Sequence, residues 1–461
     1  MLRNSPVSPE ALAGWAVVIV VLVAAAARLS RRDAGWFHPL ALPLVALAVM
    51  SLAAPLCVYL ARQPVGLLYD PGHPPGFPSP LAVPLSLMAC EALVLVLVGY
   101  ISGVVATCAL VTPVVPRDLS MPAFRPEVRR AGLVLLAAGA CAELVVAYLS
   151  RGTSYGADQF SYGTPALLQH AAATALLAGL ITVTLTEGKP RRLREVLRGR
   201  EWALLAAYLL AVALTGARGG LIPPLVFLAW VYAIRIRSIT LRQVTVIFAV
   251  ALVVGAVIVG YRSGDGQFPT SPAVVAARAI SAVSSSAWLT QQTVADVPSE
   301  YTYTRGSTYV AAVEGQLPGP LARRFGATGR TASSVFRDII GFTDPGQGFA
   351  ESLPSEAYLN FGLAGCLWAG LLFGLLMGWA SRKARAYPLR PRDLLYPVLL
   401  AGLIAGFRSD ALAQVKEVLY PLLVIAPLMA WYRLPGGATT RVLPLAPSPL
   451  EPVLLSGPLG N

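Results

Sequence analysis

The amino-acid sequence predicts an all-α polytopic membrane protein. Of the 461 residues, 56% are hydrophobic and only 13% are charged, and the mean hydropathy is +0.64. A soluble domain carries about 25% charged residues, so charge is depleted nearly twofold. Apolar stretches of about 20 residues, the length of a helix that spans a bilayer, also recur along the chain.

We expect eleven membrane-spanning helices, of which the sixth, seventh and tenth are short and are either broken or bury their ends in protein. The predicted spans are 11–28, 39–60, 85–113, 131–149, 165–185, 202–216, 220–235, 243–261, 359–380, 394–407 and 413–431. Residues 1–261 thus form an N-terminal bundle of eight helices, and residues 359–433 hold the last three. The tail 434–461 is rich in Pro and Gly, which predicts a disordered cytoplasmic end.

The orientation follows from the basic residues, because loops rich in Lys and Arg stay in the cytoplasm. Every second loop is basic. The loop after the fifth span contains Lys189, Arg191, Arg192, Arg194, Arg198 and Arg200, whereas the next loop has Arg218 alone. This alternation places the N-terminus outside and the C-terminus in the cytoplasm. It also assigns most of the formal charge of +13 to topology and lipid contact, so no nucleic-acid partner is expected.

Residues 262–358 form a large loop on the outer face, too long to be a simple connector. We expect this loop to be partly helical, at 272–295 and at 307–316, the second helix following a turn at Gly306. Tyr301, Tyr303 and Tyr309 offer flat faces on which sugars stack, although Tyr is also enriched at membrane interfaces for other reasons.

No metal or cofactor site is expected. The five cysteines fall inside apolar stretches, no CxxC pair occurs, and the three histidines are far apart in the sequence. Two carboxylates, Glu91 and Glu143, lie inside predicted spans, where an acid is either functional or a structural hydrogen-bonding partner. We favour the structural interpretation for both.

Several cations lie at the predicted outer boundary of the membrane. Arg218 lies in a tight Gly-flanked turn between the sixth and seventh spans, and Arg408 ends the tenth. Arg262 follows the eighth span and Lys416 begins the eleventh. Guanidinium groups bind phosphate oxygens in a bidentate manner, so these residues predict a site for a lipid-linked pyrophosphate. The alternative is that each side chain only reaches ordinary lipid headgroups.

Three motifs carry a family resemblance. Residues 346–365 read GQGFAESLPSEAYLNFGLAG, residues 305–309 read RGSTY ahead of Leu317-Pro318, and Thr215 to Gly220 form a Ser/Thr-x-x-Arg-Gly turn. Together the motifs resemble the oligosaccharide repeat-unit polymerases, the Wzy-type O-antigen and capsule polymerases, over roughly residues 210–420.

The resemblance implies a GT-C-like superfold in the bacterial cytoplasmic (inner) membrane. It implies transfer of a glycan from undecaprenyl pyrophosphate to a second lipid-linked repeat unit, by inversion and without a metal or other cofactor. A chain-length regulator and a flippase would be further partners. Nearest in chemistry is an O-antigen ligase-like enzyme, which typically has a histidine in the outer loop, and residues 262–357 contain none. A lipid-oligosaccharide flippase or transporter is the alternative from another class.

On this interpretation, each candidate residue receives a role. Arg218 and Arg408 stabilise the leaving pyrophosphate, and Arg262 and Arg305 are lesser candidates for the same role. Glu356, and after it Glu351, is the candidate base or acceptor-positioning group. Alternatively, Glu356 only caps the ninth span. The remaining substrate-binding candidates are Tyr309, Tyr358, Asn360 and Lys416.

Overall fold

A computed structural model describes residues 9–30, 40–49, 87–110, 126–149, 164–185, 192–215, 218–236, 239–240, 242–243, 246, 289–315, 330–339, 352–384, 395–406 and 411–431. Within these ranges the regular structure is helical and no β-strand occurs. The fold class predicted from the sequence is therefore confirmed as all-α.

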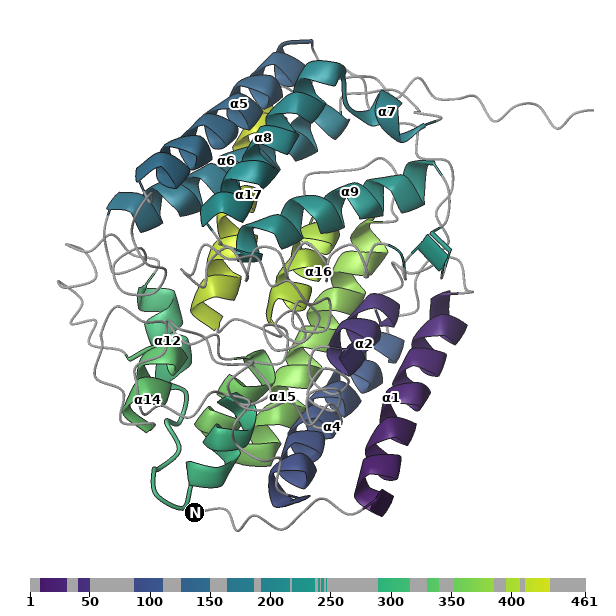
Figure 1. Cartoon of the computed structure of the whole chain (residues 1–461), viewed down its shortest axis with the longest axis vertical. Helices are drawn as coiled ribbons and strands as arrows, with labels where there is room; N and C mark the ends of the chain where they lie inside the picture. The colour runs from purple at the N-terminus through teal and green to yellow at the C-terminus, as the bar shows by residue number, and fades with distance from the viewer. Residues whose placement is uncertain are drawn as a thin grey trace, which may run out of the picture.

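The helices form two groups joined by a third (Figure 1). At the top of the view lie α5 (Pro126–Leu149), α6 (Thr164–Leu185) and α8 (Gly199–Thr215), with the short α7 (Leu193–Val196) beside them. At the bottom lie α1 (Pro9–Ser30), α4 (Leu87–Leu110) and the long α15 (Leu353–Ala384), with α2 (Ala41–Leu47) against α1. Between the groups run α9 (Ile222–Arg235), α16 (Leu395–Gly406) and α17 (Ala411–Trp431).

Two short helices from the predicted outer loop, α12 (Ser307–Glu314) and α14 (Ala332–Ile339), lie along the left edge of the view. The helix predicted at 307–316 is thus confirmed, with Gly306 before it at a φ of 89°. Of the helix predicted at 272–295, residues 289–295 are described and are helical.

Most predicted spans coincide with a described helix to within a few residues. Of the second span, the structure describes only the first part as helix, and most of the eighth lies outside the described residues. The largest difference is at α15, which begins at Leu353 rather than at residue 359. Ser352 precedes this helix and its Oγ accepts the backbone N–H of Ser355 at 3.3 Å, so the local capping sets the start. Whether each helix crosses the bilayer stays a prediction, as does the number eleven.

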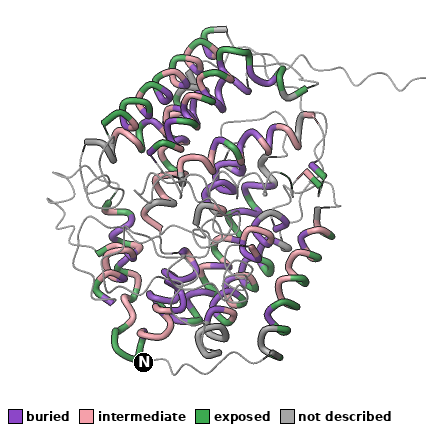
Figure 2. The backbone as a smooth tube through the Cα atoms, in the orientation of Figure 1, coloured by how far each residue is buried: buried purple, intermediate pink, exposed green. Residues whose placement is uncertain are grey.

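Two helices are long and apolar enough to cross a membrane by length and composition, Glu127–Leu149 in α5 and Leu353–Ser381 in α15. Only 33% and 39% of their apolar windows are buried, whereas the core helix of a soluble protein is mostly buried. The outward faces of α1 and α5 are exposed along their length (Figure 2). On α15 an exposed apolar stripe recurs at helical spacing through Trp368, Leu372, Leu375 and Trp379. Such faces fit contact with lipid.

Small residues bring the helices of the lower group together. A Cβ atom on Gly103 of α4 would collide with the Leu367 carbonyl oxygen of α15, and one on Gly370 would collide with the Tyr100 carbonyl oxygen. Thr107 adds a hydrogen bond, because its hydroxyl donates to the Leu371 carbonyl at 2.9 Å. Close backbone approach through Gly and Thr is typical of helix pairs in membranes, where apolar contact alone gives little specificity.

The upper group contains a buried ion pair. Arg129 of α5 donates from Nη2 to both carboxylate oxygens of Glu201 in α8, at 2.7 and 2.8 Å, and Glu201 is fully buried. Glu201 also accepts the backbone N–H of Arg198 at 2.7 Å, as an acid in the first turn of a helix commonly does. The pair therefore fastens the beginning of α8 to α5.

Candidate functional site

A break in α15 attaches residues 301–309 of the predicted outer loop, called here the outer segment, to the helix bundle. Phe361 (φ −143°, ψ 16°) and Gly362 (φ 65°, ψ −153°) leave helical geometry. The carbonyls just before the break, those of Leu359 and Asn360, accept the backbone N–H groups of Thr304 and Arg305 at 3.1 Å. A segment some 55 residues away in sequence is thereby paired to the broken turn.

Asn360 occupies the centre of this junction and is completely buried. Its Oδ1 accepts from the Thr304 hydroxyl and from the Gly306 N–H, both at 2.7 Å. Its Nδ2 donates to the Thr308 hydroxyl at 2.7 Å and to the Glu356 carbonyl at 2.8 Å. Two donated and two accepted bonds use the whole capacity of the amide, so the side chain is held in one orientation.

Glu356 links three helices. Its Oε1 accepts from the Thr308 hydroxyl of α12 at 2.7 Å, and its Oε2 accepts the backbone N–H of Ala411, the first residue of α17, at 2.6 Å. The side chain is 1% exposed. The sequence offered the start of the ninth span as the helix that Glu356 caps. Glu356 does lie in the first turn of α15, and its carboxylate also caps α17, because the first N–H groups of a helix have no partner within it and lie at its positive end.

Tyrosines of the outer segment and of α15 pack at the same junction. Tyr358 is buried, donates to the Val297 carbonyl at 3.1 Å and meets the ring of Tyr303 edge-on, with 6.1 Å between ring centroids. A Cβ on Gly362 would lie 2.9 Å from the Tyr303 hydroxyl oxygen, so the positive φ and the close contact both require glycine there. Tyr309 is half-buried. Burial raises its pKa above the ordinary value, and the nearby Glu356 carboxylate raises it further.

Arg305 is exposed and has a φ of 50°, an uncommon conformation for a residue other than glycine. Its N–H bond to the Asn360 carbonyl and the next residue, Gly306 at φ 89°, fix this turn. The guanidinium group therefore extends from a fixed backbone at the edge of the junction. Such strain persists only where the surroundings impose it.

A cavity of about 40 Å³ with several polar side chains in its lining lies beneath the turn that contains Arg218. That turn is η4 (Arg218–Leu221), between α8 and α9. The cavity is lined by His170 of α6, Tyr208 of α8, Gly220 of η4 and Lys416, Glu417 and Tyr420 of α17, among others. The Tyr208 hydroxyl donates to the Gly220 carbonyl at 3.3 Å, which ties η4 to α8.

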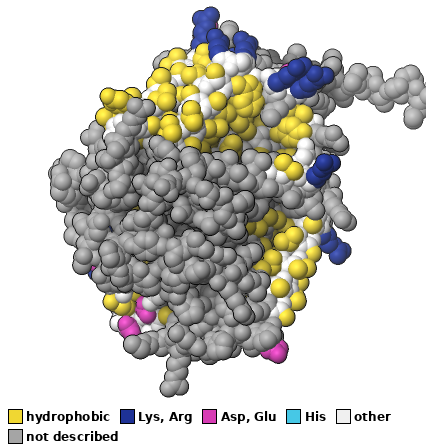
Figure 3. Space-filling view, viewed as in Figure 1, with side chains coloured by type: hydrophobic (Ala, Val, Ile, Leu, Met, Phe, Trp, Pro, Cys, Tyr) yellow, Lys and Arg dark blue, Asp and Glu magenta, His cyan; other side chains and the backbone are white. Residues whose placement is uncertain are grey.

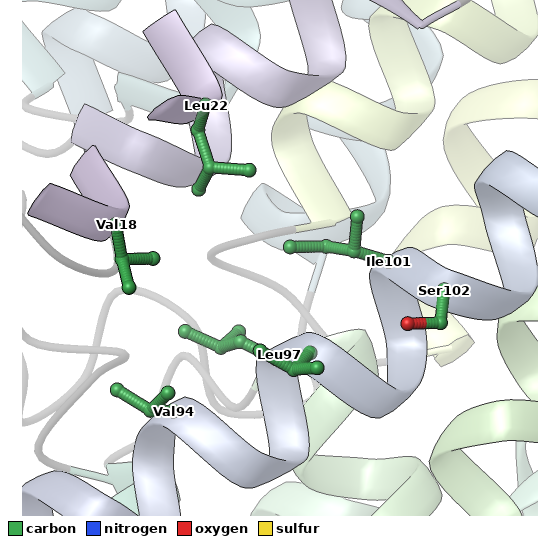
Figure 4. Close-up of a pocket in the computed structure, with 7 residues that line it drawn as sticks. Val18, Leu22, Val94, Leu97, Ile101 and Ser102 are labelled. Atoms are coloured by element: carbon green, nitrogen blue, oxygen red, sulfur yellow. The ribbon is translucent and has the colours of Figure 1, made fainter. Parts of the chain in front are cut away.

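A second hollow, between α1 and α4, has a different character (Figure 4). It measures about 200 Å³ and is lined by Val18, Leu22, Val94, Leu97, Val98, Ile101 and Ser102. Since its lining is almost wholly aliphatic, it offers no contacts for a glycan or a phosphate. The polar chemistry lies at the junction of α12, α15 and α17 and at the cavity beneath η4.

The structure describes the side chains of Glu356, Asn360, Arg305, Tyr309, Tyr358 and Lys416, and of Arg218 the backbone only. Glu351, Arg408 and Arg262 lie outside the described residues. The structure brings Glu356, Asn360 and the segment of Arg305 and Tyr309 together. Lys416 lies separately, at the cavity, five residues beyond the Ala411 contact. Their roles in substrate binding and catalysis stay predictions.

Sequence reasoning gave no role to Thr304 or Thr308, nor to the Arg129–Glu201 pair, and it offered Tyr303 only as a face for sugar stacking. The signal for Thr308 was present, because it belongs to the RGSTY motif. Glu143 was expected to be structural, and it is fully buried with its Oε1 accepting from Gln169 at 3.3 Å. No three His, Cys, Asp or Glu side chains among the described residues form a group that could hold a metal ion.

Apolar outward faces, glycine-mediated helix contacts and a polar junction at the helix ends define a helical membrane protein. Residues 201–433 match the family model of the O-antigen polysaccharide polymerase Wzy, so the chain belongs to this family. The match runs from α8 to α17 and includes the whole junction and four of the five elements around the cavity. No curated protein and no solved structure matches the chain.

Members of this family are multi-pass proteins of the inner membrane that act on lipid-linked oligosaccharide repeat units. The chain is accordingly a membrane polymerase of glycosyltransferase type that acts in polysaccharide biosynthesis.

Proposed function

We propose that the protein polymerises undecaprenyl-pyrophosphate-linked repeat units on the outer face of the cytoplasmic membrane. The glycan leaves its lipid pyrophosphate and is joined to the non-reducing end of another lipid-linked unit. The reaction inverts the anomeric centre, and cationic side chains rather than a metal ion stabilise the departing pyrophosphate.

The observation that carries this proposal is the junction itself. The hydrogen bonds of Glu356 and Asn360 join two motifs of the resemblance, RGSTY and the segment before Gly362, to the first residue of α17. Arg408 precedes that residue by three positions in the chain. Arg305 and Arg408 are therefore each three residues before a residue that donates a hydrogen bond to the Glu356 carboxylate, Thr308 and Ala411 respectively.

The arrangement of the helices supports the proposed orientation. The loop predicted to be cytoplasmic contains α7, and the loop predicted to be outside contains α12. In Figure 1, α7 lies at the upper right of the molecule and α12 at the lower left. Lys and Arg atoms line the top and right edges in Figure 3, and Asp and Glu atoms occur at the lower edge. Such an asymmetry fits basic loops in the cytoplasm.

Of the two roles weighed for Glu356, the contacts favour positioning. Both of its oxygens accept hydrogen bonds within the protein, and the side chain is buried. In this role Glu356 sets the start of α17 against α12. A carboxylate that already accepts at both oxygens is poorly placed to take a proton from a sugar.

The test replaces Arg218 and Arg408 separately by Ala, with Arg151→Ala as the matched control. Arg151 is also a lone arginine of a predicted outer loop, but it lies outside the motifs and is expected to contact only lipid headgroups. Both site variants should abolish polymer on a polysaccharide gel while single repeat units persist. Lys should restore little, because an ammonium group cannot grip two oxygens in a planar fork.

Full polymer length in both alanine variants would refute the pyrophosphate site. Topology is tested independently with reporter fusions at residues 195, 300 and 387. The first and last should report the cytoplasm, and residue 300 the outside. A cytoplasmic residue 300 would put the junction on the wrong face for this reaction.

A further inference from the structure

The cavity beneath η4 contains a carboxylate that the proposed reaction does not yet use. Glu417 lines the cavity, and its Oε2 is buried without a hydrogen-bond partner among the described residues. A buried acceptor left without a donor is costly, and such groups commonly mark a place where a ligand or an ordered water donates.

Polar side chains from α6, α8 and α17 share the cavity with Glu417, while Ala173, Leu177 and Pro421 make other parts of the lining apolar. His170 approaches from α6, Tyr208 from α8, and Lys416 and Tyr420 come from α17 itself. From η4 and α9 the cavity receives Gly220, Pro223 and Pro224, which carry no titratable group. A further acid, Glu143 of α5, lies behind Tyr208 and interacts electrostatically with it, as Glu417 does.

The size of the cavity limits what can enter. One water needs roughly 10–15 Å³ of such space, so about 40 Å³ accepts a hydroxyl group with one or two waters, but not a sugar ring. The cavity also lies close to the junction. Lys416 and Glu417 lie five and six residues beyond Ala411, or roughly 8–9 Å along the axis of α17 from the contact with Glu356.

We propose that this cavity binds the reacting hydroxyl of the acceptor glycan and that Glu417 accepts its proton. The inference rests on the proposed function and names the group that the function leaves open. The acceptor oxygen bonds to the anomeric carbon of the donor, and the bond between that carbon and the pyrophosphate oxygen breaks. The electron pair of the broken bond leaves with the pyrophosphate, and the hydroxyl proton passes to Oε2 of Glu417.

This assignment gives different roles to Glu356 and to Glu417. Glu356 accepts at both oxygens and sets the start of α17. Glu417, six residues further along α17, has an oxygen left to accept a proton. Because η4 borders the cavity through Gly220, the developing pyrophosphate charge would lie near Arg218, the first residue of the same turn.

The experiment compares Glu417→Gln with Glu143→Gln in the full-length protein reconstituted in bilayers with lipid-linked repeat units. Glu143 is the matched control, because its Oε2 is also buried without a described partner but it does not line the cavity. Glu417→Gln should slow transfer by about 10²–10⁴-fold, the usual contribution of a positioned proton acceptor. It should also remove the loss of rate at acidic pH, while substrate binding changes little. Glu143→Gln should keep most of the rate.

Three results would overturn the inference: a wild-type rate in Glu417→Gln, an equal loss in both variants, or a slow variant with an unchanged pH profile. If the Glu417→Gln protein does not accumulate, Glu417→Asp is measured in its place. Its carboxylate is shortened by one methylene, so transfer should slow while the loss of rate at acidic pH remains. Full rate in that variant would also contradict the inference. If the wild-type protein itself forms no polymer from lipid-linked units, the proposed function fails instead.

Discussion

Two buried glutamates hold helices together in different parts of the molecule, and they do so differently. Glu201, beside the basic loop, meets the guanidinium group of Arg129 at 2.7 Å. Glu356, at the outer junction, accepts from a hydroxyl and a backbone N–H, which are both neutral donors. The charge of Glu201 is matched by a cation, whereas the hydrogen bonds described for Glu356 come from two neutral dipoles.

The two contacts therefore differ in whether apolar side chains could replace them. A buried ion pair can often be replaced by apolar residues of similar volume without loss of stability, but removing one partner is strongly destabilising. A carboxylate that orders a helix start and a loop through directional bonds has no apolar substitute. We therefore expect Glu201 to matter for folding and Glu356 to matter for the rate.

The largest effect on stability should come from Glu201→Ala, which leaves Arg129 buried without its partner. We expect a loss of about 3–5 kcal/mol, seen as little protein in membranes and a lowered Tm in detergent. The double variant Arg129→Met with Glu201→Leu should recover most of this loss. A wild-type Tm in the single variant would show that the pair is not needed.

Glu356→Gln should mainly affect the rate of polymerisation. Hydrogen bonds to a charged group contribute about 1.5–3 kcal/mol, so misplacing α17 should slow transfer by roughly 10–100-fold. The pH–rate profile should keep its shape, because Glu356 holds α17 and does not take the proton. A loss of about 10²–10⁴-fold together with the loss of the acid limb would instead make Glu356 the base.

Gly362→Ala tests whether the break in α15 is required. The backbone of Gly362 (φ 65°, ψ −153°) lies in a region essentially restricted to glycine, which costs another residue about 1–3 kcal/mol, and the new methyl group would press on the Tyr303 hydroxyl. Combining it with Tyr303→Phe should recover part of the loss in Tm and polymer yield, since only the contact is relieved. Unchanged polymer in Gly362→Ala alone would show that the junction tolerates a regular helix.

The smallest effects should come from two tyrosines, one in α15 and one in the outer segment. Tyr358→Phe leaves the buried Val297 carbonyl without its donor and should lower stability by about 0.5–1.5 kcal/mol. The exposed Tyr301 makes a bond of the same length, 3.1 Å, to the Asp338 carbonyl, but water can replace that bond. Tyr301→Phe should therefore change stability by less than about 0.5 kcal/mol. Equal losses of Tm would contradict this ranking.

Composition and periodicity were sufficient to predict the helical membrane class and the approximate ends of most described helices. Burial in lipid forces each span to be long, apolar and helical, and each of these properties follows from the local sequence. The turn at Gly306 and the helix after it were also predictable, because positive φ and helix starts have local signatures. The motifs predicted the polymerase family on similarly local grounds.

The partners of the buried polar groups were decided only by the tertiary structure. Nothing near Glu356 in sequence shows that its carboxylate meets Thr308 and the start of α17, 48 and 55 residues away. Likewise, Glu417 and His170 are far apart in the chain and meet only because α17 packs against α6. A hydrogen bond depends on position in three dimensions to within a fraction of an ångström, and that position follows from how the helices pack rather than from local sequence.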